Sequence, residues 1–418
     1  PQAPMVPRRG VACRPPEPAL PPPSRRGPAP MVVWEVVGGA DKGGILVRDG
    51  QALSSDAEKE RLSTGALIEE LELFGERLHY KLKKGLGPDD GWVSIRVNGR
   101  ALVQLVPDAD EDAGGPGEPG PVEVDEGLRR QVEEWAAAAR KQDALSRYLM
   151  KYKPMGFPLS EPKLRVLCFP CELSSEVIFT GAGSPLAAWA RDTKAVEICA
   201  FDYPGRNRLI KAPKHTSLDT LVPELLAVFL DKLRDGVPYV VWGHSVGAWV
   251  AFEFLVLARR IGLPLPKACF LMAFPAPHLP WSRRPWRRSR TLNEEQLKEE
   301  LLNWDRGHFL GAGQVVFDNP SWKDVWEPLM RSEFQLFDEY KFRHKGLPKF
   351  DFPVHSWHFD GEHYVKPETV EMWREWTSGP FDFELLQGMG HLTCFYRPEL
   401  KRQYVQKVTD LVGRYADL

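Results

Sequence analysis

One short stretch of the chain combines the residue types and the spacing that nucleophilic catalysis needs. Gly-His-Ser-Val-Gly occupies residues 243–247, directly after one apolar run and directly before another. This is the G-x-S-x-G pattern in the strand–turn–helix context that it requires. The flanking glycines permit a sharp turn that lifts Ser245 Oγ to the end of a sheet, where the N–H of Val246 can face a developing oxyanion. The pattern predicts a nucleophilic serine, and a Gly/Ser turn between two buried elements is the alternative.

The elements that would position this serine are apolar strands that alternate with amphipathic helices. Such alternation indicates a mostly parallel, doubly wound sheet. With the serine turn on a central strand, this is an α/β-hydrolase architecture, predicted for residues 161–418 with a helical lid at about 281–345. The expected strands are residues 164–170, 196–201, 239–242, 268–274, 352–359 and 381–386, and the expected helices are residues 218–234, 250–261, 292–304, 325–340, 367–376 and 398–415.

A smaller all-β module is predicted ahead of this domain, over residues 31–106. Short β-type runs alternate there with Gly/Asp turns, which is typical of a small barrel. The segment 75–97, in which Gly-Trp-Val enters the last strand, resembles the closing hairpin of SH3-like modules. Such an SH3-like barrel could bind a peptide or a protein partner, and a structural spacer is the alternative.

Three further segments complete the predicted organisation. Residues 1–30 hold eleven prolines and five arginines against one acid, so a disordered tail is expected. Residues 107–126 carry eight acids and no base, which indicates an extended acidic Gly/Pro linker. Residues 127–160 are expected to join the two domains through an amphipathic helix that runs to residue 152. The Arg-rich tail also fits the end of a transit peptide, so a cytoplasmic and a plastid location both stay open.

Composition argues against several classes of function. The 418 residues are 43% hydrophobic and carry a formal net charge of −2, which gives no bulk preference for nucleic acid. No apolar run reaches the ~18–20 residues that span a bilayer, so no membrane segment is expected. The six cysteines are scattered, which indicates free thiols in a reducing compartment. No metal site and no cofactor are predicted, because the C-x-x-C at Cys168 and Cys171 lacks the second pair of a zinc site.

Five short motifs follow one another from residue 169 onwards. They are Phe-Pro at 169–170, Asp-Tyr-Pro-Gly-Arg at 202–206, the serine pattern, Ala-Pro-His-Leu-Pro at 276–280 and Gly-Met-Gly-His at 388–391. Together they closely resemble the type II thioesterases that accompany polyketide and non-ribosomal peptide synthases, over residues 163–416. The resemblance implies hydrolysis of acyl groups from the phosphopantetheine arm of an acyl carrier protein, in support of polyketide, non-ribosomal peptide or fatty-acid biosynthesis.

The resemblance also implies which side chains act. Ser245 matches the nucleophile and His391 the general base, in the Ser–acid–His chain order of this architecture. The family's G-x-x-D-x-x-V pattern, counted back from Val365, puts Glu362 at the acid. Asp360 is the alternative acid, and a solvated turn acid is the other interpretation of either carboxylate.

The chain departs from the family after Phe-Pro. The family has Ala-Gly-Gly there, and a backbone N–H of that loop completes the oxyanion hole, whereas this chain has Cys171, Glu172, Leu173 and two serines. Val246 is one expected oxyanion donor, and Cys171 or Glu172 is carried over as the second. Glu172 also adds a negative charge near the developing anion, so weak or altered activity is expected.

Basic residues in the predicted lid offer a contact for the carrier. Arg283, Arg284, Arg287 and Arg288 could meet an acidic carrier protein or the phosphate of its arm, and a solvated basic loop is the alternative. Two other functions stay open for the whole chain. One is a serine esterase or acyltransferase that acts on a free acyl ester, and the other is a non-catalytic scaffold that binds carrier proteins.

Overall fold

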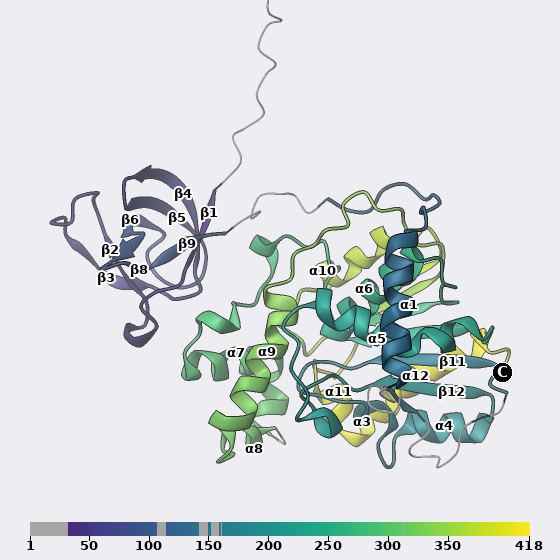
Figure 1. Ribbon diagram of the computed structural model, residues 1–418. Coiled ribbons are helices and arrows are strands. Elements are labelled where there is room, and N and C mark those ends of the chain that lie inside the picture. Colours follow the sequence, from purple (N-terminus) through teal and green to yellow (C-terminus); the bar gives the residue numbers. More distant parts are fainter. Residues whose placement is uncertain (1–31, 107–113, 142–148, 152–158, 160, 312) are drawn as a thin grey trace, which may run out of the picture.

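The computed structural model describes residues 32–106, 114–141, 149–151, 159, 161–311 and 313–418. Two sheets of seven strands each organise these described residues, one near the N-terminus and one in the larger C-terminal part (Figure 1). The predicted tail, residues 1–30, and residues 107–113 of the predicted acidic linker lie outside the described residues.

The N-terminal sheet is antiparallel and runs in the order β3-β2-β6-β5-β4-β1-β9. In β5, inward apolar and outward polar residues alternate: Leu78 and Tyr80 are buried, whereas Lys81 is exposed. β5 and β6 form the hairpin expected from segment 75–97, and the SH3-like assignment of the sheet stays a prediction. The elements here are β1 (Val33–Val36), η1 (Ala40–Lys42), β2 (Ile45–Arg48), β3 (Ala57–Leu62), β4 (Leu67–Phe74), β5 (Arg77–Lys84), β6 (Asp90–Ser94), β7 (Arg96–Val97), β8 (Arg100–Ala101) and β9 (Val103–Leu105).

The larger sheet is the mostly parallel, doubly wound sheet expected from the sequence. Its order is β10-β12-β11-β13-β14-β15-β16, and only β10 is antiparallel among the recorded pairs of described strands. β13, the strand that leads to Ser245, is the fourth of the seven. The strands are β10 (Leu149–Lys151), β11 (Leu164–Phe169), β12 (Val196–Phe201), β13 (Tyr239–His244), β14 (Cys269–Met272), β15 (Val354–Phe359) and β16 (Phe381–Leu386).

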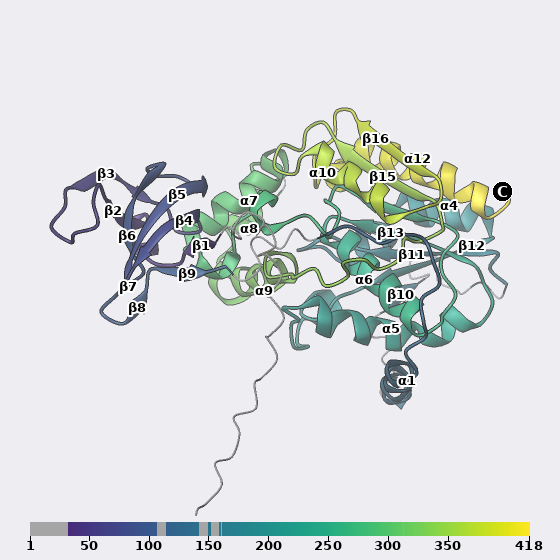
Figure 2. The same ribbon diagram turned by 90° about the horizontal axis from the view of Figure 1, so that it is seen from above.

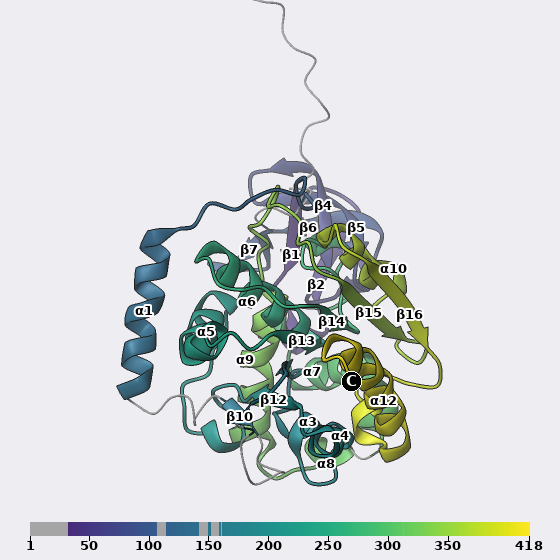
Figure 3. The same cartoon turned by 90° about the vertical axis from the view of Figure 1, so that its right-hand side faces the viewer.

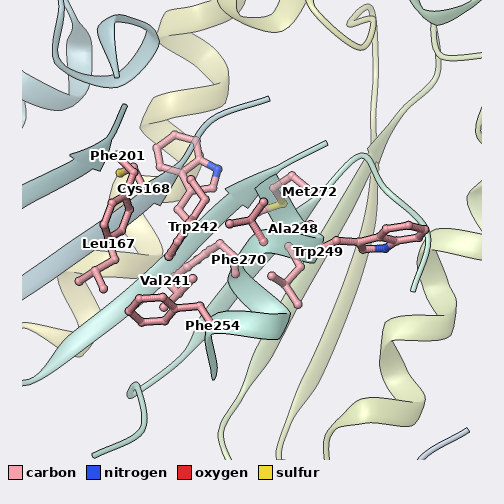
Figure 4. Close-up of a cluster of buried hydrophobic side chains, with 14 of the residues drawn as sticks. Leu167, Cys168, Phe201, Val241, Trp242, Ala248, Trp249, Phe254, Phe270 and Met272 are labelled. Atoms are coloured by element: carbon pink, nitrogen blue, oxygen red, sulfur yellow. The ribbon is translucent and has the colours of Figure 1, made fainter. Parts of the chain in front are cut away.

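Helices cover both faces of this sheet. α1, α5 and α6 lie on one side of it, and α4 and α12 lie on the other (Figure 3). Central strands are therefore buried on both faces, which accounts for their largely apolar sequences. Figure 4 shows the core around Trp242 of β13, Phe254 of α6 and Phe270 of β14. The elements are α1 (Glu126–Lys141), α3 (Val177–Thr180), α4 (Pro185–Thr193), η2 (Asn207–Leu209), α5 (Leu218–Arg234), α6 (Val246–Arg260), α10 (Pro367–Glu371), η6 (Met372–Trp376), α11 (Thr393–Tyr396) and α12 (Pro398–Tyr415).

The connecting segment differs from its prediction. The helix expected up to residue 152 is described as α1 over Glu126–Lys141, and residues 142–148 lie outside the described residues. Leu149–Lys151, expected to be helical, form the edge strand β10. β10 pairs with β12, where Leu149 lies opposite Phe201. The edge of a sheet offers unpaired N–H and C=O groups to any extended segment, and helical periodicity in the sequence does not reveal such a partner.

The segment between β14 and β15 forms a helical cover, which we call the lid. It lies beside the N-terminal sheet (Figure 2) and is joined to it by hydrogen bonds. Arg288 Nη1 donates to Glu35 Oε2 at 2.5 Å, and Lys84 Nζ donates to the carbonyl of Trp286 at 2.6 Å. The lid elements are η3 (Trp281–Arg283), η4 (Ser289–Thr291), α7 (Glu294–Phe309), α8 (Gln314–Phe317), η5 (Trp322–Trp326) and α9 (Glu327–Asp338).

Within the described part of the chain, no helix combines the length and the apolar character that crossing a bilayer requires.

Candidate active site

The turn between β13 and α6 holds Ser245 in a strained conformation. Its backbone has φ 55° and ψ −133°, outside the regions that a residue with a side chain prefers. A Cβ at position 247 would lie 2.2 Å from the carbonyl oxygen of Phe169, and one at position 243 would lie 2.5 Å from the carbonyl oxygen of Gly247. Only glycine therefore fits on either side of the serine, as the G-x-S-x-G pattern requires.

Two side chains from distant loops lie in a row with this serine, each within hydrogen-bond distance of the next. His391 Nε2 lies 2.7 Å from Ser245 Oγ, and Glu362 Oε2 lies 2.6 Å from His391 Nδ1. The other oxygen of Glu362 accepts the N–H of Tyr364 at 2.9 Å, which fixes the carboxylate. All three members of the line are buried. Asp360 is exposed and accepts the N–H of Gly388, so the structure brings Glu362, and not Asp360, to the histidine.

The charges around His391 decide its protonation. Burial by itself lowers the pKa of His391, but the carboxylates of Glu362, Glu172 and Asp305 outweigh burial and raise the pKa above its ordinary value. The neighbouring His244 behaves in the opposite way. Burial and the charge of His391 lower the pKa of His244 to about 3. This second imidazole is therefore neutral at neutral pH and does not serve as the general base.

The Glu172 side chain reaches Ser245. Ser245 Oγ donates to Glu172 Oε2 at 2.9 Å, and Glu172 Oε1 lies 3.9 Å from His391 Nε2. From the sequence we expected the charge of Glu172 near the oxyanion, but not a hydrogen bond between its carboxylate and Ser245. The expected oxyanion donors, the backbone N–H of Val246 and that of Cys171 or Glu172, stay a prediction. The close approach of Gly247 to Phe169 and Pro170 does bring this loop against the serine turn. The Cys171 thiol is buried, and burial raises its pKa.

Arg206 holds the loop in place of the missing glycines. This buried residue of the Asp-Tyr-Pro-Gly-Arg motif donates through Nη1 to the carbonyls of Cys171, at 2.7 Å, and Ser174. Its Nε pairs with Glu333 of α9, and Glu333 also accepts the N–H of Leu173 at 2.5 Å. We call these two side chains the Arg206–Glu333 clasp. Sequence reasoning missed Glu333, because a lone acid on an amphipathic helix carries no signal of a partner 127 residues away.

Most of the arginine run is engaged inside the protein, and its contact with a carrier stays a prediction. Arg284 and Arg288 are buried, and Arg287 pairs with Glu300 at 2.8 Å, so only Arg283 of the four is exposed. Arg284 donates to the carbonyls of Leu279, Phe337 and Tyr340. Arg284 and Arg287 find their acceptors within the lid, and Arg288 finds one in Glu35 of the N-terminal sheet.

The lid closes over the histidine. The ring of Trp304, in α7, lies 5.0 Å from that of His391 between centroids. The next residue, Asp305, breaks the helix with φ −156° and ψ 87°, and its Oδ2 accepts the N–H groups of Leu392 and Thr393 at 2.7 and 2.9 Å. This kink ties the lid to the loop that carries the histidine, a connection with no signal in the sequence.

The chain was compared with known protein families and curated proteins. Residues 165–401 match the family model described as Thioesterase domain. Among curated proteins, the chain is 26% identical over 232 residues to the gramicidin S biosynthesis protein GrsT of Aneurinibacillus migulanus. The aligned segment covers 55% of this chain and 82% of that protein. The chain is 28% identical over 161 residues to the medium-chain S-acyl fatty acid synthase thioesterase of Homo sapiens. This aligned segment covers 37% of this chain and 57% of that protein.

A solved structure shares the fold of the same part of the chain. The RedJ thioesterase from the prodiginine biosynthetic pathway of Streptomyces coelicolor superposes with a TM-score of 0.50 at 23% identity. The match covers 60% of this chain and 88% of that protein. At this level of identity, the likeness supports the α/β-hydrolase fold alone.

Proposed function

This chain belongs to the thioesterase domain family, and we propose that it hydrolyses acyl groups from the phosphopantetheine arm of a carrier protein. In this proposal Ser245 is the nucleophile, His391 the general base and Glu362 the acid that orients it. The single observation that carries the proposal is the buried line of the three side chains, with separations of 2.7 and 2.6 Å. Hydrogen-bond reach between nucleophile and base, and between base and orienting acid, is what covalent acyl transfer requires.

The proposed reaction has two halves. Neutral His391 takes the Ser245 proton as Oγ bonds to the thioester carbonyl carbon, and the oxyanion accepts hydrogen bonds from the backbone N–H groups of Val246 and Glu172. The C–S bond then breaks, and the thiol of the arm leaves with the proton from His391. In the second half, water attacks the acyl-serine and gives a proton to His391. His391 passes this proton to Ser245 Oγ as the carboxylic acid leaves.

The choice of a carrier-bound substrate is supported by the relatives. One is by name a fatty acid synthase thioesterase, and another is by name a gramicidin S biosynthesis protein. A phosphopantetheine arm is long and narrow, so it can carry an acyl group to a buried serine. Ser245 and His391 have no exposed surface, so the arm reaches them only when the lid moves.

Release of an acyl group from a loaded carrier protein tests the reaction. Wild type is expected to release it, and Ser245→Ala is expected to lower kcat by about 10⁴–10⁶, because no other group forms the acyl intermediate. The assay follows free acid and free thiol together. Release that survives in Ser245→Ala would remove Ser245 from the mechanism. Hydrolysis of a free acyl ester but not of the loaded carrier would favour the esterase, and binding without hydrolysis would favour the scaffold.

The acid is tested separately. Glu362→Gln is expected to lower kcat by about 10⁴, because an amide cannot stabilise the imidazolium that forms when His391 takes the serine proton. Asp360→Asn is the matched control, since this carboxylate lies two residues away and is exposed. Its kcat is expected to stay within a factor of about 3 of wild type. Equal losses in the two variants would show that neither carboxylate orients the base by direct contact.

A further inference from the structure

The carboxylate of Glu172 faces the reacting atom without a cationic partner of its own. It is only 4% exposed, and its Oε2 lies 2.9 Å from Ser245 Oγ. Within the described part of the chain, the recorded bonds of the neighbouring Arg206 go to the loop carbonyls and to Glu333, not to Glu172. Among the residues that the structure describes, the cationic contact of Glu172 is His391, whose Nε2 lies 3.9 Å from Oε1, when that imidazole is protonated.

This arrangement opposes the reaction proposed above. A hydroxyl has one hydrogen, so a Ser245 that donates to Glu172 cannot donate to His391. A negative charge beside the developing oxyanion also raises the barrier, because the transition state gains negative charge there. A buried carboxylate is stable only with a partner of opposite charge or with hydrogen bonds, so a competent complex must supply Glu172 with a new donor.

We propose that the substrate supplies this donor, as a protonated amine close to the thioester carbonyl, so that Glu172 selects aminoacyl groups over neutral acyl groups. This inference rests on the proposed function. In an aminoacyl thioester the α-nitrogen lies about 2.5 Å from the carbonyl carbon, as set by the N–Cα and Cα–C bonds. That carbon bonds to Ser245 Oγ, which is itself 2.9 Å from Glu172 Oε2. When the ammonium group is turned toward Glu172, these separations let it reach ion-pair distance of the carboxylate.

The pairing releases the nucleophile. Once the ammonium group donates to Glu172, the charge of Glu172 no longer helps to hold a proton on His391. His391 Nε2 then gives its proton to solvent, and the hydroxyl of Ser245 is free to donate to Nε2. The charge beside the oxyanion is neutralised at the same time, and the ammonium group keeps its protons throughout. The Arg206–Glu333 clasp holds the loop on both sides of Glu172, so the carboxylate stays in place to receive the amine. A neutral acyl group offers no such donor and meets Ser245 still bound to Glu172.

Two thioesters that differ only in the amine test the proposal. Leucyl and 4-methylpentanoyl thioesters of N-acetylcysteamine share one carbon skeleton. The kcat/KM of wild type is expected to favour the leucyl thioester by about 10–100-fold beyond the uncatalysed ratio, the range of a charge-assisted hydrogen bond. Glu172→Gln is expected to return the ratio to the uncatalysed one, and Glu172→Asp to keep part of the preference. Glu176→Gln is the control, because this buried carboxylate of the same segment bonds Asn207.

A binding measurement makes the test independent of turnover. Leucinamide is expected to raise the thermal unfolding midpoint of Ser245→Ala, 4-methylpentanamide is not, and the double variant with Glu172→Gln is expected to lose the effect. A wild-type ratio no higher than the uncatalysed one would overturn the proposal. Faster hydrolysis of both thioesters by Glu172→Gln at an unchanged ratio would overturn it too, since Glu172 would then only block the serine. If wild type hydrolyses neither thioester nor the loaded carrier, the proposed function fails, and leucinamide binding alone decides the inference.

Discussion

At the scale of single residues, the chemistry depends on where one proton lies. Ser245 Oγ has two neighbours within hydrogen-bond distance, His391 Nε2 at 2.7 Å and Glu172 Oε2 at 2.9 Å. When the hydroxyl donates to Glu172, the contact with His391 is made by a hydrogen on Nε2. With Nδ1 facing Glu362, the imidazole is then protonated on both nitrogens. The resting arrangement thus holds the base in its charged form, in accord with the raised pKa of His391.

The pH profile of kcat/KM on a neutral acyl thioester reports the protonation state of His391. The rate is expected to rise with pH, with its acid limb above pH 6.5, because only neutral His391 accepts the serine proton and its pKa is raised from 6.5. Glu172→Gln removes one of the carboxylates that raise this pKa, so its acid limb is expected at lower pH than that of wild type. A limb that moves upward in the variant would contradict the assignment of His391 as the titrating base.

At the scale of elements, the loop after β11 is held by side chains instead of by glycine conformations. Arg206 follows β12 and Glu333 lies on α9 of the lid, so the clasp joins the sheet, the loop and the lid at one point. Both side chains are buried. A buried ion pair adds little net stability compared with apolar residues of similar size, but the loss of one partner is costly. We therefore infer that the clasp serves mainly to position the loop.

A double-mutant cycle separates positioning from stability. Arg206→Met is expected to lower the free energy of unfolding by about 3–5 kcal/mol, because Glu333 is left buried and unpaired. Adding Glu333→Leu is expected to recover most of this stability, as apolar replacement of a whole buried pair often does. kcat of the double variant is expected to stay about 10²–10³ below wild type, since the oxyanion loop is no longer aimed. Wild-type kcat in a stable double variant would show that the loop needs no clasp.

At the scale of the whole molecule, the lid lies against the N-terminal sheet. Lys84 Nζ donates to the carbonyl of Trp286, and Arg288 pairs with Glu35 across the contact. Burial lowers the pKa of Lys84 to about 7, with Glu300 and Glu35 acting against burial. The sheet therefore braces the lid from outside the catalytic domain. Whether it also binds a protein partner, as expected for an SH3-like module, stays a prediction.

The contact between the N-terminal sheet and the lid is tested by removing one partner of an ion pair that joins them. Glu35→Ala is expected to lower the free energy of unfolding by about 2–5 kcal/mol and to speed proteolysis of the lid. The reason is that buried Arg288 then keeps only the Glu339 carboxylate, 3.8 Å from its Nε. Lys83→Ala is the control in the same sheet, since Lys83 forms an ion pair with Glu69 near the surface, and its cost is expected below about 1 kcal/mol. Urea unfolding and limited proteolysis measure both. Unchanged lid proteolysis in Glu35→Ala would show that the N-terminal sheet does not restrain the lid.

Much of the fold follows from local patterns. The strands at 196–201 and 381–386 and the helices at 218–234 and 398–415 lie where the sequence predicted them, because periodicity and end signals are local. β3 and β9 of the N-terminal sheet fall outside the β-type runs of the sequence, which are residues 32–37, 45–48, 67–74, 78–82 and 92–97. β3 is exposed over most of its length, and β9 has three residues, so neither carries a clear alternation.

The sequence by itself determined the serine turn, the order of Ser245, acid and His391 along the chain, and the family. These follow from short motifs whose geometry is set by neighbouring residues. The tertiary structure decided that Glu362 faces His391, that Arg284 and Arg288 are buried, and that the Glu172 carboxylate reaches Ser245. Each of these depends on contacts between separate elements, 73 residues apart for Glu172 and Ser245. Such contacts are set by packing and by the partners that burial demands, and no local pattern encodes them.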